Sequence, residues 1–128
     1  MPVLHSIQTP EQIQIEIWHI TESVDELLAM LILTPVGKRL FESYKNEKRK
    51  KEWLASRLLL QKINNEKPVT VRYTKKGRPF KQKSMPWFSI SHTTDYVAVA
   101  SSNTSPIGVD IEIPSDRILK IKNRFLSL

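Results

Sequence analysis

The segment FSISHTTDYVAVASSNTSPIGVDIEIP, residues 88–114, decides the fold because it contains most of three consecutive predicted strands. Aromatic, β-branched and small residues dominate WFSISH (87–92), YVAVAS (96–101) and IGVDIEI (107–113), and the turn-forming TTD separates the first two. The first two strands are therefore expected to form a hairpin. Side chains alternate along a strand, so Asp110 and Glu112 share one face of the third strand and its isoleucines share the other.

The elements before this segment include a strand and two helical regions. Alternation predicts a strand over residues 13–20, and Ser23 with Glu26 three residues later predicts a capped helix through about Leu31. Residues 38–64 contain neither Pro nor Gly and are rich in helix formers, which predicts one or two helices. The second half of this segment is apolar around most of the helix circumference, as in a buried helix. Residues 69–73, VTVRY, read as a strand.

The end of the chain is expected to be helical. The pattern RILKIKNRFLSL predicts a last helix that starts near Ser115 or Asp116 and is still running at residue 128. Strands and helices mixed without regular alternation indicate an α+β fold, with a small mixed sheet packed on a long helix.

Composition limits the classes of function. The 128 residues suit one modest domain or a fragment of something larger. The chain carries 20 Lys and Arg against 13 Asp and Glu, a net charge of +7, which favours an anionic partner such as nucleic acid, a phosphorylated cofactor, an acidic protein or an acidic membrane surface. The sequence has no cysteine, which excludes disulfides and thiolate metal sites. Neither a signal-peptide pattern nor a membrane-spanning run is present, so a soluble cytoplasmic protein is expected.

Asp110 and Glu112 have two possible explanations. At about 7 Å, two carboxylates repel by about 2 kcal/mol if the effective dielectric constant is about 20. They are either the solvent-facing side of an amphipathic strand or a site for a hard cation, since Mg²⁺ takes protein carboxylates together with water and substrate phosphates. Gly108 beside them leaves room for a ligand.

Three further features bear cations or an imidazole. His92 falls at a strand end, where it is either solvated or functional. The run NEKRKKEWLASR contains five cations; residues 48–51 fit a solvated helix face, whereas Arg57, inside LASRLLL, needs an anionic partner if buried. The loop KKGRP is either a basic turn or a phosphate-binding loop.

Five segments of the sequence occur in this order: WLASRLLLQKI, KGRP, FSISHTTDYVAVA, IGVDIE and KIKNRFLS. Together they resemble the first lobe of the larger, two-lobed type of 4′-phosphopantetheinyl transferase. The resemblance covers residues 35–127, and ISH followed by a strand and IGVDIE is its most specific part. It implies one lobe of that fold and an enzyme that moves the phosphopantetheine arm of coenzyme A to a serine of an acyl or peptidyl carrier protein. Mg²⁺ would bridge the coenzyme A diphosphate.

The resemblance also assigns roles to individual residues. Asp110 and Glu112 correspond to the two Mg²⁺ ligands, and Ser91 and His92 to the pair that contacts the coenzyme A phosphates. The resemblance implies four cations in cofactor binding. One is Arg78 in KGRP, and the others lie in the segment that holds basic residues for the 3′-phosphate: Arg49, Lys51 and Arg57. No catalytic residue is assigned.

The sequence departs from the family where the family has a second lobe. That lobe carries W-x-x-K-E, the source of a third acidic ligand and of the base that activates the carrier serine, and no counterpart occurs in residues 1–128. The chain is therefore expected to be a single N-terminal lobe, completed by a second-lobe polypeptide or by self-association, with nucleic acid and membrane not expected as partners.

Two alternatives stay open. The first is an inactive lobe that only binds coenzyme A or a carrier protein. The second is a Mg²⁺-dependent nuclease, whose D…[DE]-x-K pattern requires a lysine where Glu112 and Pro114 stand.

Overall fold

The computed structural model describes residues 3–10, 12–67, 69, 71–73, 75, 79–80, 86–113 and 120–125. Its helices are α1 (Val24–Met30), α2 (Pro35–Ser43) and α3 (Glu47–Ile63). Its strands are β1 (Val3–Gln8), β2 (Gln14–His19), β3 (Arg72–Tyr73), β4 (Pro79–Phe80), β5 (Trp87–Thr93), β6 (Tyr96–Ser102), β7 (Ile107–Glu112) and β8 (Lys120–Phe125). The α+β class is confirmed.

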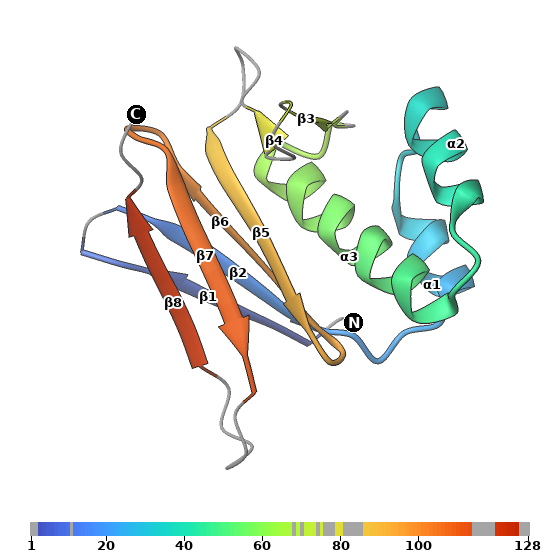
Figure 1. The fold of residues 1–128 in the computed structure, drawn as a ribbon, viewed down its shortest axis with the longest axis horizontal. Coiled ribbons are helices and arrows are strands. Elements are labelled where there is room, and N and C mark those ends of the chain that lie inside the picture. Colours follow the sequence, from blue (N-terminus) through green and yellow to red (C-terminus); the bar gives the residue numbers. More distant parts are fainter. Residues whose placement is uncertain are drawn as a thin grey trace.

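An antiparallel four-stranded sheet forms the centre, with strand order β1-β2-β6-β5. The expected hairpin is β5 and β6, which turn at Thr94 and Asp95. Strands β7 and β8 form a separate antiparallel ribbon. Figure 1 shows α3 on one side of the sheet and this ribbon on the other, so the fold has three layers.

Alternation along the strands divides the core between the two faces of the sheet. On the helix side, Trp18, Val97 and Val99 pack with the buried leucines of α3. On the ribbon side, the isoleucines of residues 13, 15 and 17 pack with Ile107 and Ile111 of β7. Because side chains alternate along a strand, neighbouring residues of the same strand pack against opposite layers: Val97 and Val99 face the helix, and Ala98 and Ala100 face the ribbon.

The helix starts follow local capping rules. The Ser23 hydroxyl accepts a hydrogen bond from the Glu26 backbone N–H, and the Ser23 N–H donates to the Glu26 carboxylate at 3.1 Å, which confirms the predicted capping box. The Thr34 side chain caps α2 by accepting the Gly37 N–H, and the Asn46 side chain caps α3 by accepting the Arg49 N–H. Hydrogen bonds from Ser23 and, more weakly, the charge of Lys51 lower the pKa of Glu26 below its ordinary value.

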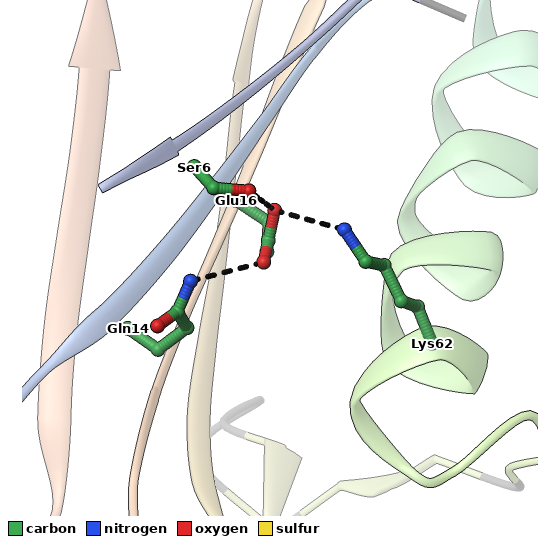
Figure 2. A network of polar contacts seen from close by, with 4 residues as sticks. All are labelled: Ser6, Gln14, Glu16 and Lys62. Carbon is green, nitrogen blue, oxygen red and sulfur yellow. Dashed lines mark hydrogen bonds and ion pairs between the residues drawn. The ribbon is translucent and has the colours of Figure 1, made fainter. Parts of the chain in front are cut away.

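A buried carboxylate joins the sheet to the end of α3. Glu16 is only 6% exposed, yet its oxygens accept hydrogen bonds from Ser6 of β1 and Gln14 of β2 and an ion-paired contact from Lys62 of α3 at 3.3 Å (Figure 2). A buried carboxylate is tolerated only when its oxygens are paired, so the network fixes β1, β2 and α3 relative to one another.

Three expectations about the chain ends and the middle need correction. The prediction of a last helix was wrong, because residues 120–125 form β8, which pairs with β7. In KIKNRF the period is two: Ile121 lies opposite Ile111 and packs in the ribbon-side core, while its lysine neighbours are exposed. A strand at Val3–Gln8 was not anticipated. Among the described residues of VTVRY, Arg72 and Tyr73 are in a strand and Val69 and Val71 are not. Residues 114–119, where the helix was expected to start, lie outside the described residues.

None of the described helices is both long enough and apolar enough to cross a membrane.

Candidate functional site

Ser91 of β5 and Asp110 of β7 lie in direct contact. The Ser91 hydroxyl donates a hydrogen bond to Asp110 Oδ1 at 3.4 Å and accepts one from the backbone N–H of Ile111 at 3.1 Å. The two residues belong to different motifs, nineteen positions apart in the sequence. The fold thus brings together a residue expected to bind coenzyme A and one expected to bind Mg²⁺.

Small side chains allow β7 to lie this close to the sheet. Ser89 and Ser91 of β5 stand opposite Ala100 and Ala98 of β6, so this part of the ribbon-side face bears no large side chain. Ser89 uses the space as Ser91 does, accepting the Val109 N–H at 3.2 Å. The serine hydroxyls therefore satisfy backbone donors of β7 that would otherwise lie against the sheet unpaired.

Asp110 and Glu112 are both exposed, as expected for the polar face of β7. In the register of the ribbon, Asp110 lies opposite Lys122 and Glu112 opposite Lys120, which places two cations on the same face. Within the described residues, no ion pair joins either carboxylate to these lysines. Both carboxylates therefore keep oxygens available to a ligand.

This donor set fits a hard divalent cation that keeps other ligands. Two carboxylates on one strand face supply the one or two protein oxygens that Mg²⁺ takes beside water and phosphate. In the described part of the chain, no three His, Asp or Glu side chains are close enough to form a metal site by themselves. The arrangement suits a cation shared with a bound phosphate rather than one enclosed by protein.

His92 points to the opposite side of β5 from Ser91, toward α3. Its Nδ1 lies 3.0 Å from Oε2 of Glu52, and the imidazole is 47% exposed whereas the Glu52 side chain is 9% exposed. A carboxylate at Nδ1 holds the Nδ1–H tautomer or the charged imidazolium and fixes the ring orientation. With Nδ1 occupied, Nε2 is the nitrogen available to a ligand.

The three predicted cations of α3 do not share a face. With 3.6 residues per turn, Lys51 lies about 160° and Arg57 about 80° around the helix from Arg49. Arg49 stacks over the Tyr44 ring at 5.0 Å, and Lys51 lies toward Glu26 of α1. A single phosphate group therefore does not meet all three.

Arg57 is 7% exposed and held within α3. Its guanidinium donates to the Ser56 hydroxyl at 3.1 Å and lies 5.0 Å from the centre of the Trp53 ring. These contacts give the buried cation a place in the packing of the helix. Arg78, the remaining predicted cation, lies outside the described residues.

Glu52 is the site residue that sequence reasoning missed. In the sequence it is one acid within a run of cations and was not predicted to belong to the site, yet it is buried beside His92. A signal was present, because an acid on the apolar side of a helix needs a partner. Lys48 is exposed and lies one turn earlier on the same helix face as Glu52, so it is a candidate cation on the His92 side of the site.

The residues around β5 suit a ligand with several phosphates. A hydroxyl and two carboxylates lie on its ribbon side, and an imidazole with nearby cations lies on its helix side. The carboxylates can bind phosphate only through a divalent cation, whereas the imidazole and the lysines can donate hydrogen bonds to it directly.

Comparison with curated proteins finds distant relatives of one kind. The chain is 35% identical over 83 residues to the 4′-phosphopantetheinyl transferase AcpT of Salmonella typhi, covering 62% of this chain and 43% of that protein. It is 32% identical over 87 residues to AcpT of Escherichia coli K12, covering 67% of this chain and 44% of that protein. A putative 4′-phosphopantetheinyl transferase of Synechocystis is 31% identical over 81 residues, covering 58% of this chain and 33% of that protein.

These matches cover only part of each relative. The chain spans less than half the length of each of these relatives. No protein-family model matches the sequence.

Proposed function

We propose that this chain, a distant homologue of the 4′-phosphopantetheinyl transferases, provides the half-site that binds coenzyme A and Mg²⁺ for transfer of the phosphopantetheine arm to a carrier-protein serine in the cytoplasm. The observation that carries the proposal is the contact between Ser91 and Asp110. The resemblance assigns these residues to one cofactor, and the fold brings them within hydrogen-bond distance. The whole chain, residues 1–128, acts as one lobe in this proposal.

Asp110 and Glu112 hold the cation in the proposed site. When bound, Mg²⁺ neutralises charge on the diphosphate and makes its phosphorus more susceptible to attack. Ser91 restrains the Asp110 carboxylate, and the ribbon presents Glu112 on the same face. The two carboxylates and the diphosphate would thus together balance the positive charge of the cation.

His92 binds phosphate through Nε2, oriented by Glu52 at Nδ1. The cations of α3 supply the remaining charge, with Arg49, Lys51 and Arg57 as candidates for the 3′-phosphate together with Arg78 of the KGRP loop. Because Arg49, Lys51 and Arg57 face different ways, one of them rather than all three contacts that group.

In the proposed reaction, a bond forms between the carrier serine oxygen and the phosphorus that bears the pantetheine arm. The bond from that phosphorus to the 3′,5′-ADP oxygen breaks, and a base accepts the serine proton. The resemblance places this base in a second lobe. The chain therefore contributes cofactor binding and orientation, and a second-lobe polypeptide or a second copy completes the site.

Calorimetric titration with coenzyme A tests the metal and cofactor roles together. Coenzyme A is expected to bind at least tenfold more tightly in Mg²⁺ than in EDTA, and Asp110→Ala is expected to abolish that difference because it removes a cation ligand. Glu42→Ala, which removes an exposed carboxylate on α2, serves as the matched control and should keep the difference. Equal affinity of the unmodified chain in Mg²⁺ and EDTA would contradict the proposal.

The second candidate function is a binding module that holds coenzyme A or a carrier protein without turnover. The observation that favours it is that the described carboxylates provide two cation ligands and no third acid beside them. It predicts the same coenzyme A affinity, and no transfer under any condition, including addition of a second-lobe polypeptide.

A further inference from the structure

Helix α2 and the segment before it expose an apolar surface. Between the last residue of α1 and the middle of α2, four large apolar side chains are more than a third exposed: Met30 at 41%, Ile32 at 52%, Val36 at 50% and Leu40 at 37%. None of the residues of α2 is buried, although Phe41 packs at the edge of the helix-side core. We refer to these four residues as the α2 surface. In Figure 1, α2 stands at the outer side of α3, away from the sheet.

A shallow hollow lies beside the α2 surface, between α2 and α3. Val36 and Leu40 line it from α2, and Trp53 lines it from α3. Its volume is about 30 Å³, far below the roughly 300–1,000 Å³ of small-molecule sites. The hollow therefore suits one side chain of a protein partner rather than a free ligand.

Two details show that the hollow is built by close approach of the helices. A Cβ on Gly37 would lie 3.1 Å from Thr34 Oγ1 and 3.5 Å from the Trp53 ring, so a larger residue would crowd the indole. The Trp53 Nε1 is buried and, among the described residues, has no hydrogen-bond partner. The indole therefore lies at the close contact between α2 and α3, where it lines the hollow.

The surroundings of the hollow are strongly basic. Residues 36–51 contain seven Lys or Arg and two Glu, and five of the cations are exposed: Lys38, Arg39, Lys45, Lys48 and Arg49. Much of the excess positive charge of the chain is therefore concentrated around an apolar surface. A second copy of the same surface would be repelled, whereas an acidic surface would be attracted.

We propose that the α2 surface docks an acidic segment of a protein partner, which places an apolar side chain in the hollow beside Trp53. The inference rests on the proposed function in one respect: that function makes the carrier protein the partner. Arg57, a candidate for the 3′-phosphate, also lines the hollow, so the test uses Val36 and Arg39, which are not assigned to the cofactor. A concave hollow favours a protein side chain over a lipid surface. Binding to anionic lipid is the outcome that would replace this proposal.

The test measures binding of an apo acyl carrier protein to the 128-residue chain by calorimetry, with coenzyme A titrated in parallel. Val36→Glu and Arg39→Glu are expected to weaken carrier binding at least tenfold, because the first places an acid in the α2 surface and the second replaces an exposed cation of α2 by an acid. Ile7→Glu on β1 and Lys67→Glu beyond α3 are the matched controls, since Ile7 and Lys67 are also exposed, and are expected to change it less than twofold. None of the four should alter coenzyme A affinity.

The outcomes separate this proposal from the proposed function. Carrier binding that is absent from the unmodified chain, or unchanged in Val36→Glu and Arg39→Glu, would overturn the docking surface even if coenzyme A binds. Carrier binding lost in these two variants while coenzyme A fails to bind would support the docking surface and contradict the cofactor half-site. Binding to vesicles containing anionic lipid that is lost in the same two variants, without carrier binding, would overturn it in favour of a membrane.

Discussion

Ser91 and Ser89 offer a matched pair for separating structure from function. Each hydroxyl accepts a backbone N–H of β7, and only Ser91 also contacts Asp110. Replacing either by alanine leaves one β7 donor unpaired, which costs about 1–3 kcal/mol of stability for a buried group. The two variants are therefore expected to lose similar stability.

The same pair is expected to differ in cofactor binding. Ser91→Ala should reduce the Mg²⁺-dependent gain in coenzyme A affinity severalfold, because Asp110 loses its restraint, whereas Ser89→Ala should retain it. Calorimetric titration in Mg²⁺ and in EDTA, with thermal unfolding followed by circular dichroism, measures both effects. An equal loss of the gain in both variants would show that Ser91 acts only through folding.

The contact between Glu52 and His92 yields a second prediction for single residues. Glu52→Gln keeps the size of the side chain and removes the carboxylate charge that faces Nδ1 of His92. We expect the affinity for coenzyme A to fall threefold to tenfold. For a coenzyme A analogue that lacks the phosphate contacted by His92, the same substitution should lower the affinity less. The exposed control Glu42→Gln should bind as the unmodified chain does. Unchanged affinity in Glu52→Gln would assign this pair to packing alone.

At the scale of elements, helix α1 depends on its capping box. Ser23→Ala removes the hydroxyl that accepts the Glu26 N–H and is expected to cost about 0.5–2 kcal/mol of stability, the usual range for an N-cap. Chemical denaturation at pH 7 measures the loss, with Ser43→Ala at the end of α2 as the exposed control.

The pH dependence of the capping box has a definite sign. The folded chain lowers the pKa of Glu26, chiefly through hydrogen bonds from Ser23, so the folded state favours the ionised carboxyl. The stabilisation is present above the ordinary pKa of the glutamate and is lost as the pH falls through the lowered folded value. The stability difference between the unmodified chain and Glu26→Gln, which has no carboxyl to ionise, should therefore shrink in acid, and a difference that grows below pH 4 would contradict this assignment.

At the scale of the whole molecule, the proposal predicts that the 128-residue chain alone does not transfer phosphopantetheine. Its sequence has no counterpart of the W-x-x-K-E motif to which the resemblance assigns the base. Loss of general-base help lowers rates by about 10²–10⁴. A mass-shift assay with coenzyme A, Mg²⁺ and an apo carrier protein is expected to show only background modification.

The same assay tests how the site is completed. Modification that appears on addition of a second-lobe polypeptide would support the half-site, and a rate that rises with the square of chain concentration would indicate completion by a second copy. Robust modification by the monomeric chain would contradict the proposal, because it would require a base within these residues.

Much of the fold and part of the site were accessible from sequence because they depend on local periodicity. Alternation identified β2, the β5–β6 hairpin and β7, and placed Asp110 and Glu112 on one face. Ser23 and Glu26 determine the start of α1 within four residues of chain. Each of these features needs only the geometry of neighbours in a strand or a helical turn.

Only the tertiary structure decided which faces meet. The strand β8 was mistaken for a helix because KIKNRF gains its alternating pattern of burial from pairing with β7. The Glu52–His92 contact joins residues 40 positions apart, and the Ser91–Asp110 contact depends on the small residues that let β7 approach the sheet. By itself, the sequence determined which residues share a face, whereas contacts between layers follow from packing of apolar surfaces far apart in the chain, which no local period encodes.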